Sequence, residues 1–128
     1  MKLNHLALAV RDQQRSIKFY AAYFGFDPST ARWYPGGVVI IRDAEGFALA
    51  LGEARAPEGT PGFQHFGFDK DSPQEVRALG ARLVADGIEL VEDEDTETYV
   101  GFKCLDPDRH VIEVSWETGV QSPDASRR

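Results

Sequence analysis

Three side chains that can ligate a metal lie inside apolar, strand-like stretches of the sequence. His5 stands in "NHLALAV", His65 in "QHFGFD", and Glu113 between Ile112 and Val114 in "VIEVSWE". An unpaired carboxylate is costly to bury, so Glu113 on an inward strand face requires a partner or a metal. Two imidazoles and one carboxylate form a facial set suited to Fe(II) or Mn(II), or to Zn(II) or Ni(II), with positions left open for substrate or oxygen.

Each of these residues also has an ordinary structural interpretation. A histidine within an apolar strand is commonly a hydrogen-bonded core residue. Glu113 could face water if the two faces of its strand alternate. The residue types alone leave both interpretations open, so their positions in the fold must decide.

The elements that would position these residues occur twice along the chain in the order βαβββ. Asp12 is a candidate N-cap for the first helix, and Ser72, Pro73 and Glu75 form a capping box with proline for the second. The first half is expected to have strands at 3–10, 31–34, 38–42 and 47–51 and a helix at 11–24. The second is expected to have strands at 63–69, 89–92, 99–105 and 110–116 and a helix from Ser72 to Gly87.

The two halves align in two registers that agree to within three residues, which places the candidate ligands at equivalent positions. His5 falls on His65, Asp43 on Asp106, and Ala50 on Glu113. Three of the four equivalent inward positions therefore carry ligands. We expect modules at residues 1–52 and 63–117, joined by a Gly- and Pro-rich linker at 53–62 and followed by a mobile tail at 118–128, in one compact domain.

Composition narrows the classes of partner. The net charge of −7 argues against nucleic-acid binding and favours small-molecule substrates. No apolar run approaches the roughly 20 residues of a membrane span, and the first residues do not resemble a secretory signal. A single cysteine, Cys104, excludes an intramolecular disulfide and suits the cytoplasm. The acidic run "EDEDTE" at 92–97 lacks the spacing of a calcium loop and is expected to be a solvated loop.

The segments "NHLALAVRD", "QHFGFD" and "DPDRHVIEV", with the helical "SIKFYAAYFGF", resemble the vicinal oxygen chelate superfamily. This superfamily includes glyoxalase I, fosfomycin-resistance transferases, extradiol dioxygenases and bleomycin-resistance proteins. The resemblance covers Lys2 to about Glu117. It implies an α+β fold of paired βαβββ modules, whose curled mixed sheets enclose a central metal or ligand cavity, often in a homodimer with sites at a shared interface. It also implies that His5, His65 and Glu113 are the metal ligands.

The chain departs from individual branches of this superfamily at several positions. Ala50 replaces the fourth ligand of proteins similar to glyoxalase I, and Ala7 stands where a fosfomycin-type protein has a threonine. Lys103 replaces a tyrosine ten residues before the carboxylate ligand. It is expected on the same face as Glu113, where it would bind an anion or exchange protons, or else reach to the rim. Tyr99 is a candidate acid or hydrogen-bond donor, or a strand-edge aromatic.

Three functional hypotheses follow for this chain. The first is a divalent-metal-dependent enzyme, of dioxygenase, lyase, isomerase or transferase type, that chelates adjacent oxygens of a small substrate. The second is a metal-free protein of the bleomycin-resistance type that sequesters a ligand in an aromatic-lined cleft. The third is a vestigial site in a protein whose repeat serves only dimerisation. The second and third hypotheses have no use for the ligand triad.

Overall fold

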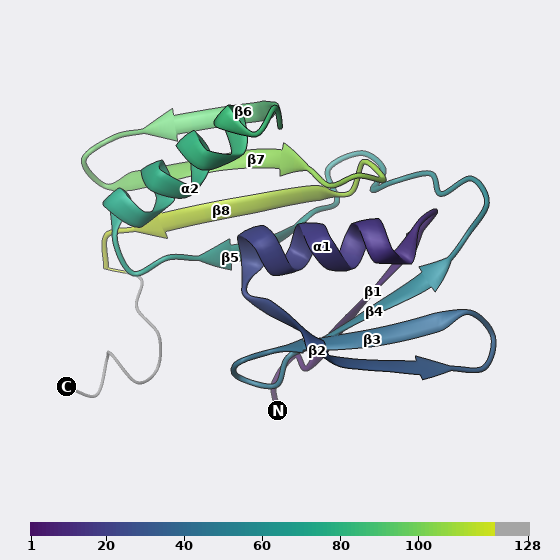
Figure 1. The fold of residues 1–128 in the computed structure, drawn as a ribbon. Helices are drawn as coiled ribbons and strands as arrows, with labels where there is room; N and C mark the ends of the chain where they lie inside the picture. The colour runs from purple at the N-terminus through teal and green to yellow at the C-terminus, as the bar shows by residue number, and fades with distance from the viewer. Residues whose placement is uncertain (120–128) are drawn as a thin grey trace. The chain divides into compact units, whose positions relative to one another are not determined.

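The computed structural model describes residues 1–119 and divides into two compact units. Unit 1 comprises Met1–Gly62 and Asp106–His110, and unit 2 comprises Phe63–Leu105 and the chain from Val111 onward. Each unit has one helix and one four-stranded mixed sheet (Figure 1). The predicted α+β class and the repeated βαβββ order are both confirmed.

Each expected element is present, although β2 begins five residues earlier than expected, β5 begins three residues later and β6 ends three residues later. Unit 1 contains β1 (His5–Val10), α1 (Gln13–Phe24), β2 (Phe26–Tyr34), β3 (Val38–Asp43) and β4 (Ala48–Glu53). Unit 2 contains β5 (Phe66–Asp69), α2 (Pro73–Ala85), β6 (Leu90–Asp95), β7 (Tyr99–Leu105) and β8 (Val111–Glu117). The predicted mobile tail begins at 118, and its residues 120–128 lie outside the described part of the chain.

Both sheets have the same strand order, with the first and last strand of the module paired in parallel at one side of the sheet. The orders are β1-β4-β3-β2 and β5-β8-β7-β6. Ala7 pairs with Ala50 in the first sheet, and Gly67 pairs with Glu113 in the second. Ala50 and Glu113 therefore occupy the same position of the repeat, as the sequence superposition predicted.

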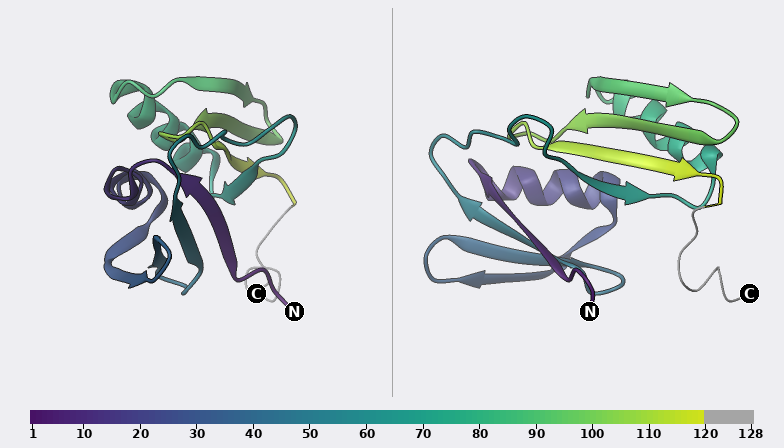
Figure 2. Two further views of the ribbon diagram at one scale, coloured as in Figure 1. Left: turned by 90° about the vertical axis from the view of Figure 1, so that its right-hand side faces the viewer. Right: turned by 180° about the vertical axis from the view of Figure 1, so that it is seen from behind.

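One helix covers one face of each sheet, and Figure 2 shows this arrangement from two further sides. The helices begin where the capping residues predict, because Asp12 accepts a hydrogen bond from Arg15 N and Ser72 accepts one from Glu75 N. Alternate strand residues such as Val10, Leu51 and Val114 are fully buried on the helix-covered faces. The residues between them point to the opposite face of each sheet, which we call the open face.

The β3–β4 and β7–β8 turns are built by the same hydrogen bonds. Asp43 Oδ1 and Asp106 Oδ1 each accept the backbone N–H groups of the residues two and four positions later, at 2.8–3.0 Å. The third residue after each aspartate has a positive φ, 86° at Gly46 and 69° at Arg109. Glycine adopts this conformation without strain, whereas Arg109 does so at a cost. The duplicated module has kept this turn in both copies.

The second of these turns is buried in unit 1, where α1 supplies its partners. Asp106 and Asp108 are 4% and 6% exposed. Tyr20 Oη donates to Asp106 Oδ2 at 2.7 Å, and Arg15 Nη2 lies 3.0 Å from Asp108 Oδ1. His110 Nε2 donates to the Ala9 carbonyl at 2.8 Å. These partners satisfy the buried polar groups, which would otherwise destabilise the fold.

The expectation that residues 92–97 form a loop is wrong for most of that run, because Glu92–Asp95 belong to β6. β6 is an edge strand whose only neighbour in the sheet is β7, so its charged side chains can remain in water while its backbone pairs. Arg77 binds Asp95 through two hydrogen bonds of 2.7 and 2.8 Å. The acidic side chains of this run therefore led us to interpret the last part of β6 as a loop.

No helix in the described part of the chain is long and apolar enough to cross a membrane.

Replacing Asp106 by alanine should destabilise the protein more than the same change at Asp43. Asp106→Ala leaves two backbone N–H groups and the Tyr20 hydroxyl without this acceptor in a buried environment, at about 1–3 kcal/mol for each group left unsatisfied. Asp43 is less buried, so water can replace its carboxylate. Urea unfolding of both variants checks this order, and equal losses of stability would contradict it.

Candidate functional site

Two of the three predicted metal ligands lie together in unit 2. Glu113 is at the middle of β8, and His65 immediately precedes β5, the strand paired with β8. His65 Nε2 lies 3.3 Å from Glu113 Oε2, and the side chains are 19% and 30% exposed. Gly67, opposite Glu113, has no side chain to crowd it: a Cβ there would lie 3.5 Å from Glu113 Cβ and 3.2 Å from its carbonyl oxygen.

The tautomer of His65 makes this pair suited to a cation. His65 Nδ1 lies 2.8 Å from the Phe63 carbonyl oxygen, which can only accept, so Nδ1 carries a proton. In the neutral ring Nε2 then presents a lone pair to the Glu113 carboxylate. Two lone pairs at 3.3 Å repel each other unless a proton or a metal ion lies between them. With ligand bonds of about 2.0–2.2 Å, adjacent ligands of one ion are about 3 Å apart, so the spacing fits a metal.

His5, the third predicted ligand, is the first residue of β1 in unit 1 and points to the open face. Its Nδ1 lies 2.7 Å from Asn4 Oδ1, which leaves Nε2 available as in His65. The predicted triad is thus divided between the two units. Among the described residues, no group of three or more His, Cys, Asp and Glu side chains is placed to hold one metal ion.

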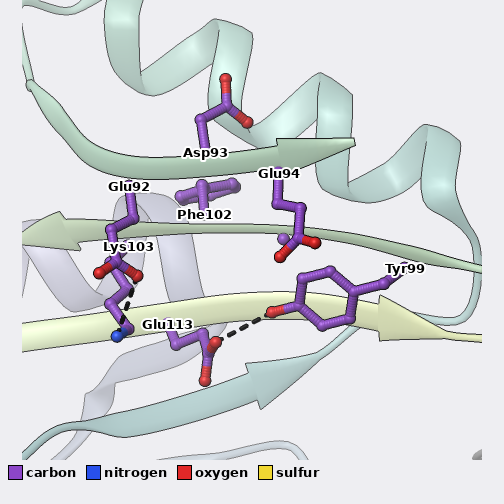
Figure 3. Close-up of a pocket in the computed structure, with 8 residues that line it drawn as sticks. Glu92, Asp93, Glu94, Tyr99, Phe102, Lys103 and Glu113 are labelled. Atoms are coloured by element: carbon purple, nitrogen blue, oxygen red, sulfur yellow. Dashed lines mark hydrogen bonds and ion pairs between the residues drawn. The ribbon is translucent and has the colours of Figure 1, made fainter. Parts of the chain in front are cut away.

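Tyr99 is in direct contact with the candidate ligand Glu113. Its hydroxyl donates to Glu113 Oε1 at 2.9 Å (Figure 3). His65 and Tyr99 therefore face different oxygens of one carboxylate. Burial, followed by the hydrogen bond and charge of Glu113 and by the charge of Glu94, raises the pKa of Tyr99 to about 12. Tyr99 therefore keeps its proton at neutral pH and remains a donor.

Gly101 provides the space through which Tyr99 reaches Glu113. Tyr99 and Gly101 are on the same face of β7, and the phenol ring folds back over the glycine. A Cβ on Gly101 would collide with the Tyr99 hydroxyl and lie 2.7–2.8 Å from its ring carbons. A side chain here would displace the phenol. Sequence reasoning missed Gly101; a glycine within a strand, two residues from an aromatic, was the available signal.

Lys103 pairs across the strands with Glu113 and lies on its face of the sheet, as parity predicted. Its ammonium lies 3.0 Å from Glu92 Oε2 and 5.5 Å from the centre of the Phe63 ring. Glu92 was not predicted to have this role, because the acidic run was interpreted as a loop. Cys104 points to the opposite face and is fully buried, as expected for a core thiol.

A cavity of about 460 Å³ lies on the open face of the second sheet. Figure 3 shows the Tyr99 hydroxyl, the Glu113 carboxylate and the Lys103 ammonium close together in it. Four carboxylates and one ammonium line it, which favours a bound cation. Its lining residues are Glu92, Asp93, Glu94, Tyr99, Gly101, Phe102, Lys103 and Glu113.

Comparison with known proteins identifies the family. Residues 2–114 match the model of the Glyoxalase/Bleomycin resistance protein/Dioxygenase superfamily, and the chain belongs to this superfamily. It is similar to glutathione transferase FosA of Serratia marcescens, with 32% identity over 88% of this chain and 78% of that protein. It is also similar to a trivalent organoarsenical cleaving enzyme of Bacillus sp. (strain MD1), with 31% identity over 77% of this chain and 59% of that enzyme.

The fold matches a solved structure over nearly its full length. The fosfomycin resistance protein FosX of Listeria monocytogenes, solved with Mn(II) and a sulfate ion, superimposes with a TM-score of 0.73. The match covers 98% of this chain and 96% of that chain, at 19% identity. It confirms the predicted paired βαβββ modules. The predicted resemblance to the vicinal oxygen chelate superfamily is likewise confirmed.

Gly101→Ala should release Tyr99 from Glu113 without removing the phenol. We expect the tyrosine that ionises near pH 12 to ionise closer to its ordinary value of about 10, because it loses both its burial and its hydrogen bond to the carboxylate. Absorbance at 295 nm during alkaline titration of metal-free protein measures this. The same titration of the Tyr99→Phe variant shows which part of the absorbance change comes from Tyr99. An unchanged titration of Gly101→Ala would contradict the role of Gly101.

The raised pKa of Tyr99 also predicts a pH dependence of stability. The protonated phenol is favoured in the folded state, so its contribution is complete below about pH 10 and is lost as pH rises toward 12. The difference in stability between wild type and Tyr99→Phe should therefore shrink over that interval. Urea unfolding at pH 8, 10 and 11 tests this, and a constant difference would refute it.

Proposed function

We propose that this chain is a divalent-metal-dependent enzyme that acts on a small molecule with adjacent oxygen atoms, and that His5, His65 and Glu113 hold the metal. The observation that carries this proposal is the approach of His65 Nε2 to within 3.3 Å of Glu113 Oε2, while His65 Nδ1 is held by the Phe63 carbonyl oxygen. A metal-free binding module needs no such arrangement. The metal, when bound, supplies Lewis-acid chemistry that polarises an oxygen of the substrate.

The residues around Glu113 have distinct roles under this proposal. Tyr99 donates a hydrogen bond to Glu113 Oε1, which orients the carboxylate and leaves Oε2 for the metal. Lys103 holds a positive charge at the cavity wall, where it can contact an anionic oxygen of the substrate or transfer a proton. Glu92 competes for that ammonium, so substrate binding would involve exchange of this ion pair.

The donor set and the comparisons favour Mn(II) or Fe(II) as the metal. Imidazole and carboxylate ligands suit both ions, whereas the absence of a thiolate ligand makes a structural zinc site a poor match. FosX, which shares this fold, was solved with Mn(II). FosA and the organoarsenical cleaving enzyme are named for different reactions. The family therefore leaves the substrate open, and the residues of this cavity must define it.

We also propose that the protein is a homodimer. His5 belongs to unit 1, whereas His65 and Glu113 belong to unit 2, so two copies can complete each other's ligand sets. β2 and β6 are edge strands of their sheets and expose backbone groups to further pairing. Both features are compatible with assembly from two copies.

Glu113→Gln should weaken metal binding at least tenfold, because the amide keeps the size of the side chain but removes the charge that offsets the cation. The stabilisation by saturating metal should fall by about 1.4 kcal/mol for each tenfold loss. The melting temperature measured with Mn(II), anaerobic Fe(II), Zn(II) or a chelator reports this effect. Glu94→Gln, which neutralises another carboxylate of the same cavity, is the control and should keep the wild-type response.

If no ion stabilises the wild type, the metalloenzyme proposal fails and the metal-free binding module replaces it. If Glu113→Gln responds to metal as strongly as the wild type, Glu113 is not a ligand.

Mixing two ligand variants tests the assembly. His5→Ala and Glu113→Ala each lack one ligand, but a hybrid dimer that shares sites between copies contains one intact set. We expect tight Mn(II) binding to reappear at about one quarter of wild-type stoichiometry after the variants are mixed and allowed to exchange. Light scattering should give a dimeric mass at micromolar concentration. A monomeric mass would refute the dimer, and a dimer without recovery would show that each chain completes its own sites.

A further inference from the structure

A second cavity, of about 550 Å³, lies on unit 1 between β2 and β3, and its lining is basic. Arg32 and Arg42 line it together with Tyr34 and Ile40. The remaining lining residues, Ser29, Thr30 and Ala31, form an irregular segment of β2. No carboxylate among residues 1–119 lines this cavity, whereas Glu53 lines the cavity that holds Arg11 and Arg55.

A β-bulge shapes this cavity. Asp27 pairs with Arg42 and Arg32 pairs with Ile40, so residues 28–31 of β2 stand opposite Ile41 alone. Thr30 holds the bulged segment to β3, since its hydroxyl donates to the Asp27 carbonyl at 2.6 Å and accepts from Arg42 N at 2.8 Å. Bulges of this kind redirect side chains and are frequent beside functional sites.

Neither guanidinium has a carboxylate partner within the described residues, where the ion pairs involve Arg15, His65, Arg77 and Lys103. Arg42 Nη1 donates to the Gly46 carbonyl at 2.9 Å, which fixes the group and leaves its other N–H groups available. Asp27, the register partner of Arg42, accepts from Ser29 N instead. The positive charge of the cavity is therefore uncompensated by the protein.

Comparison of the two modules shows where this charge arises. By the repeat, Ile40 corresponds to Lys103, because Asp43 corresponds to Asp106. In unit 2 the cross-strand pair Glu92–Lys103 forms an ion pair of 3.0 Å. The equivalent pair in unit 1 is Arg32–Ile40, in which the arginine faces an apolar residue. The second module neutralises its cation at this position, and the first does not.

The sheet register places these arginines on the same face as His5. Ala48 pairs with His5 on one side and with Arg42 on the other. Adjacent strands are about 4.8 Å apart, so the Cα atoms of His5 and Arg42 are roughly 10 Å apart across one alanine. Arg32 lies in the next row, with Ala50 and Ile40. A small molecule lying over the two alanines could contact His5 at one end and both guanidinium groups at the other.

We propose that Arg32 and Arg42 form a binding subsite for a dianionic group of the phosphate-ester type. Two guanidinium groups match two negative charges, and their planar donors suit tetrahedral oxyanions. This inference rests on the proposed function only in assigning the dianion to the same substrate that binds the metal. The substrate would then carry metal-chelating oxygens at one end and a dianionic group at the other.

Titration of chelator-treated protein with methyl phosphate at pH 7.5 and low ionic strength tests the subsite without the metal. The arginine Nε–H signals, followed by NMR, should shift at Arg32 and Arg42 with one common dissociation constant. The double variant Arg32→Gln/Arg42→Gln should bind at least tenfold more weakly, and each single variant severalfold more weakly. Acetate, a monoanion, should bind at least tenfold more weakly than methyl phosphate to the wild type.

Arg55→Gln is the matched control. It removes the same charge from a separate cavity that Arg55 shares with Arg11, and should leave the affinity unchanged. Wild-type affinity in the double variant, or an equal loss in Arg55→Gln, would overturn the subsite. Acetate binding as tightly as methyl phosphate would overturn the dianion assignment.

The outcome is separable from that of the metal proposal. If methyl phosphate binds as expected but no metal stabilises the protein, the subsite stands and the metalloenzyme fails. If metal binds through Glu113 but the double variant keeps its phosphate affinity, the subsite fails and the metalloenzyme stands.

Discussion

The parallel pairing of the first and last strand in each module is the constraint on which both candidate sites depend. A parallel pair needs a long connection, here a helix and two further strands, and the helix covers one sheet face. The other face is left to polar and small side chains. The parallel pairing brings His65 beside Glu113 and places His5 beside Ala48. Ligands far apart in the sequence thus share a face because the strands that carry them are neighbours.

The two open faces have diverged in charge while keeping the same backbone. At equivalent places beside β3 and β7, one module has a basic hollow and the other an acidic one. The acidic cavity contains the candidate ligand Glu113, and the basic cavity has uncompensated arginines. Each module therefore presents a hollow of opposite charge at an equivalent place in its own sheet. This division of roles follows from a few substitutions, such as Ile40 in place of the equivalent Lys103.

The sequence predicted the architecture well because apolar alternation, capping residues and turn residues act locally. Asp12 and Ser72 begin the helices as expected, and the repeat correctly aligned Ala50 with Glu113. Charge misled the prediction at Glu92–Asp95, because an edge strand tolerates acidic side chains that usually indicate a loop. The strand expected at 31–34 begins at Phe26, so the bulge that shapes the basic cavity was not anticipated.

The site was predictable in its residue types but not in its contacts. Strand parity placed Lys103 on the face of Glu113, yet the ion pair with Glu92 depends on the register of β6, a strand that was predicted to end at residue 92. Tyr99 reaches Glu113 because its ring folds back over Gly101, and side-chain direction of this kind depends on space, not on periodicity. His5 belongs to unit 1, whereas the other two candidate ligands belong to unit 2.

The buried Asp106–His110 turn has a consequence for how such a chain can be divided. The linker at 53–62 marks the boundary between the two copies of the module, but the first unit also contains five residues encoded after it. Tyr20, Arg15 and the Ala9 carbonyl all bind this later segment. A gene cut at the linker would yield a first half that lacks part of its own interior. The first unit therefore depends on a turn that the second module supplies.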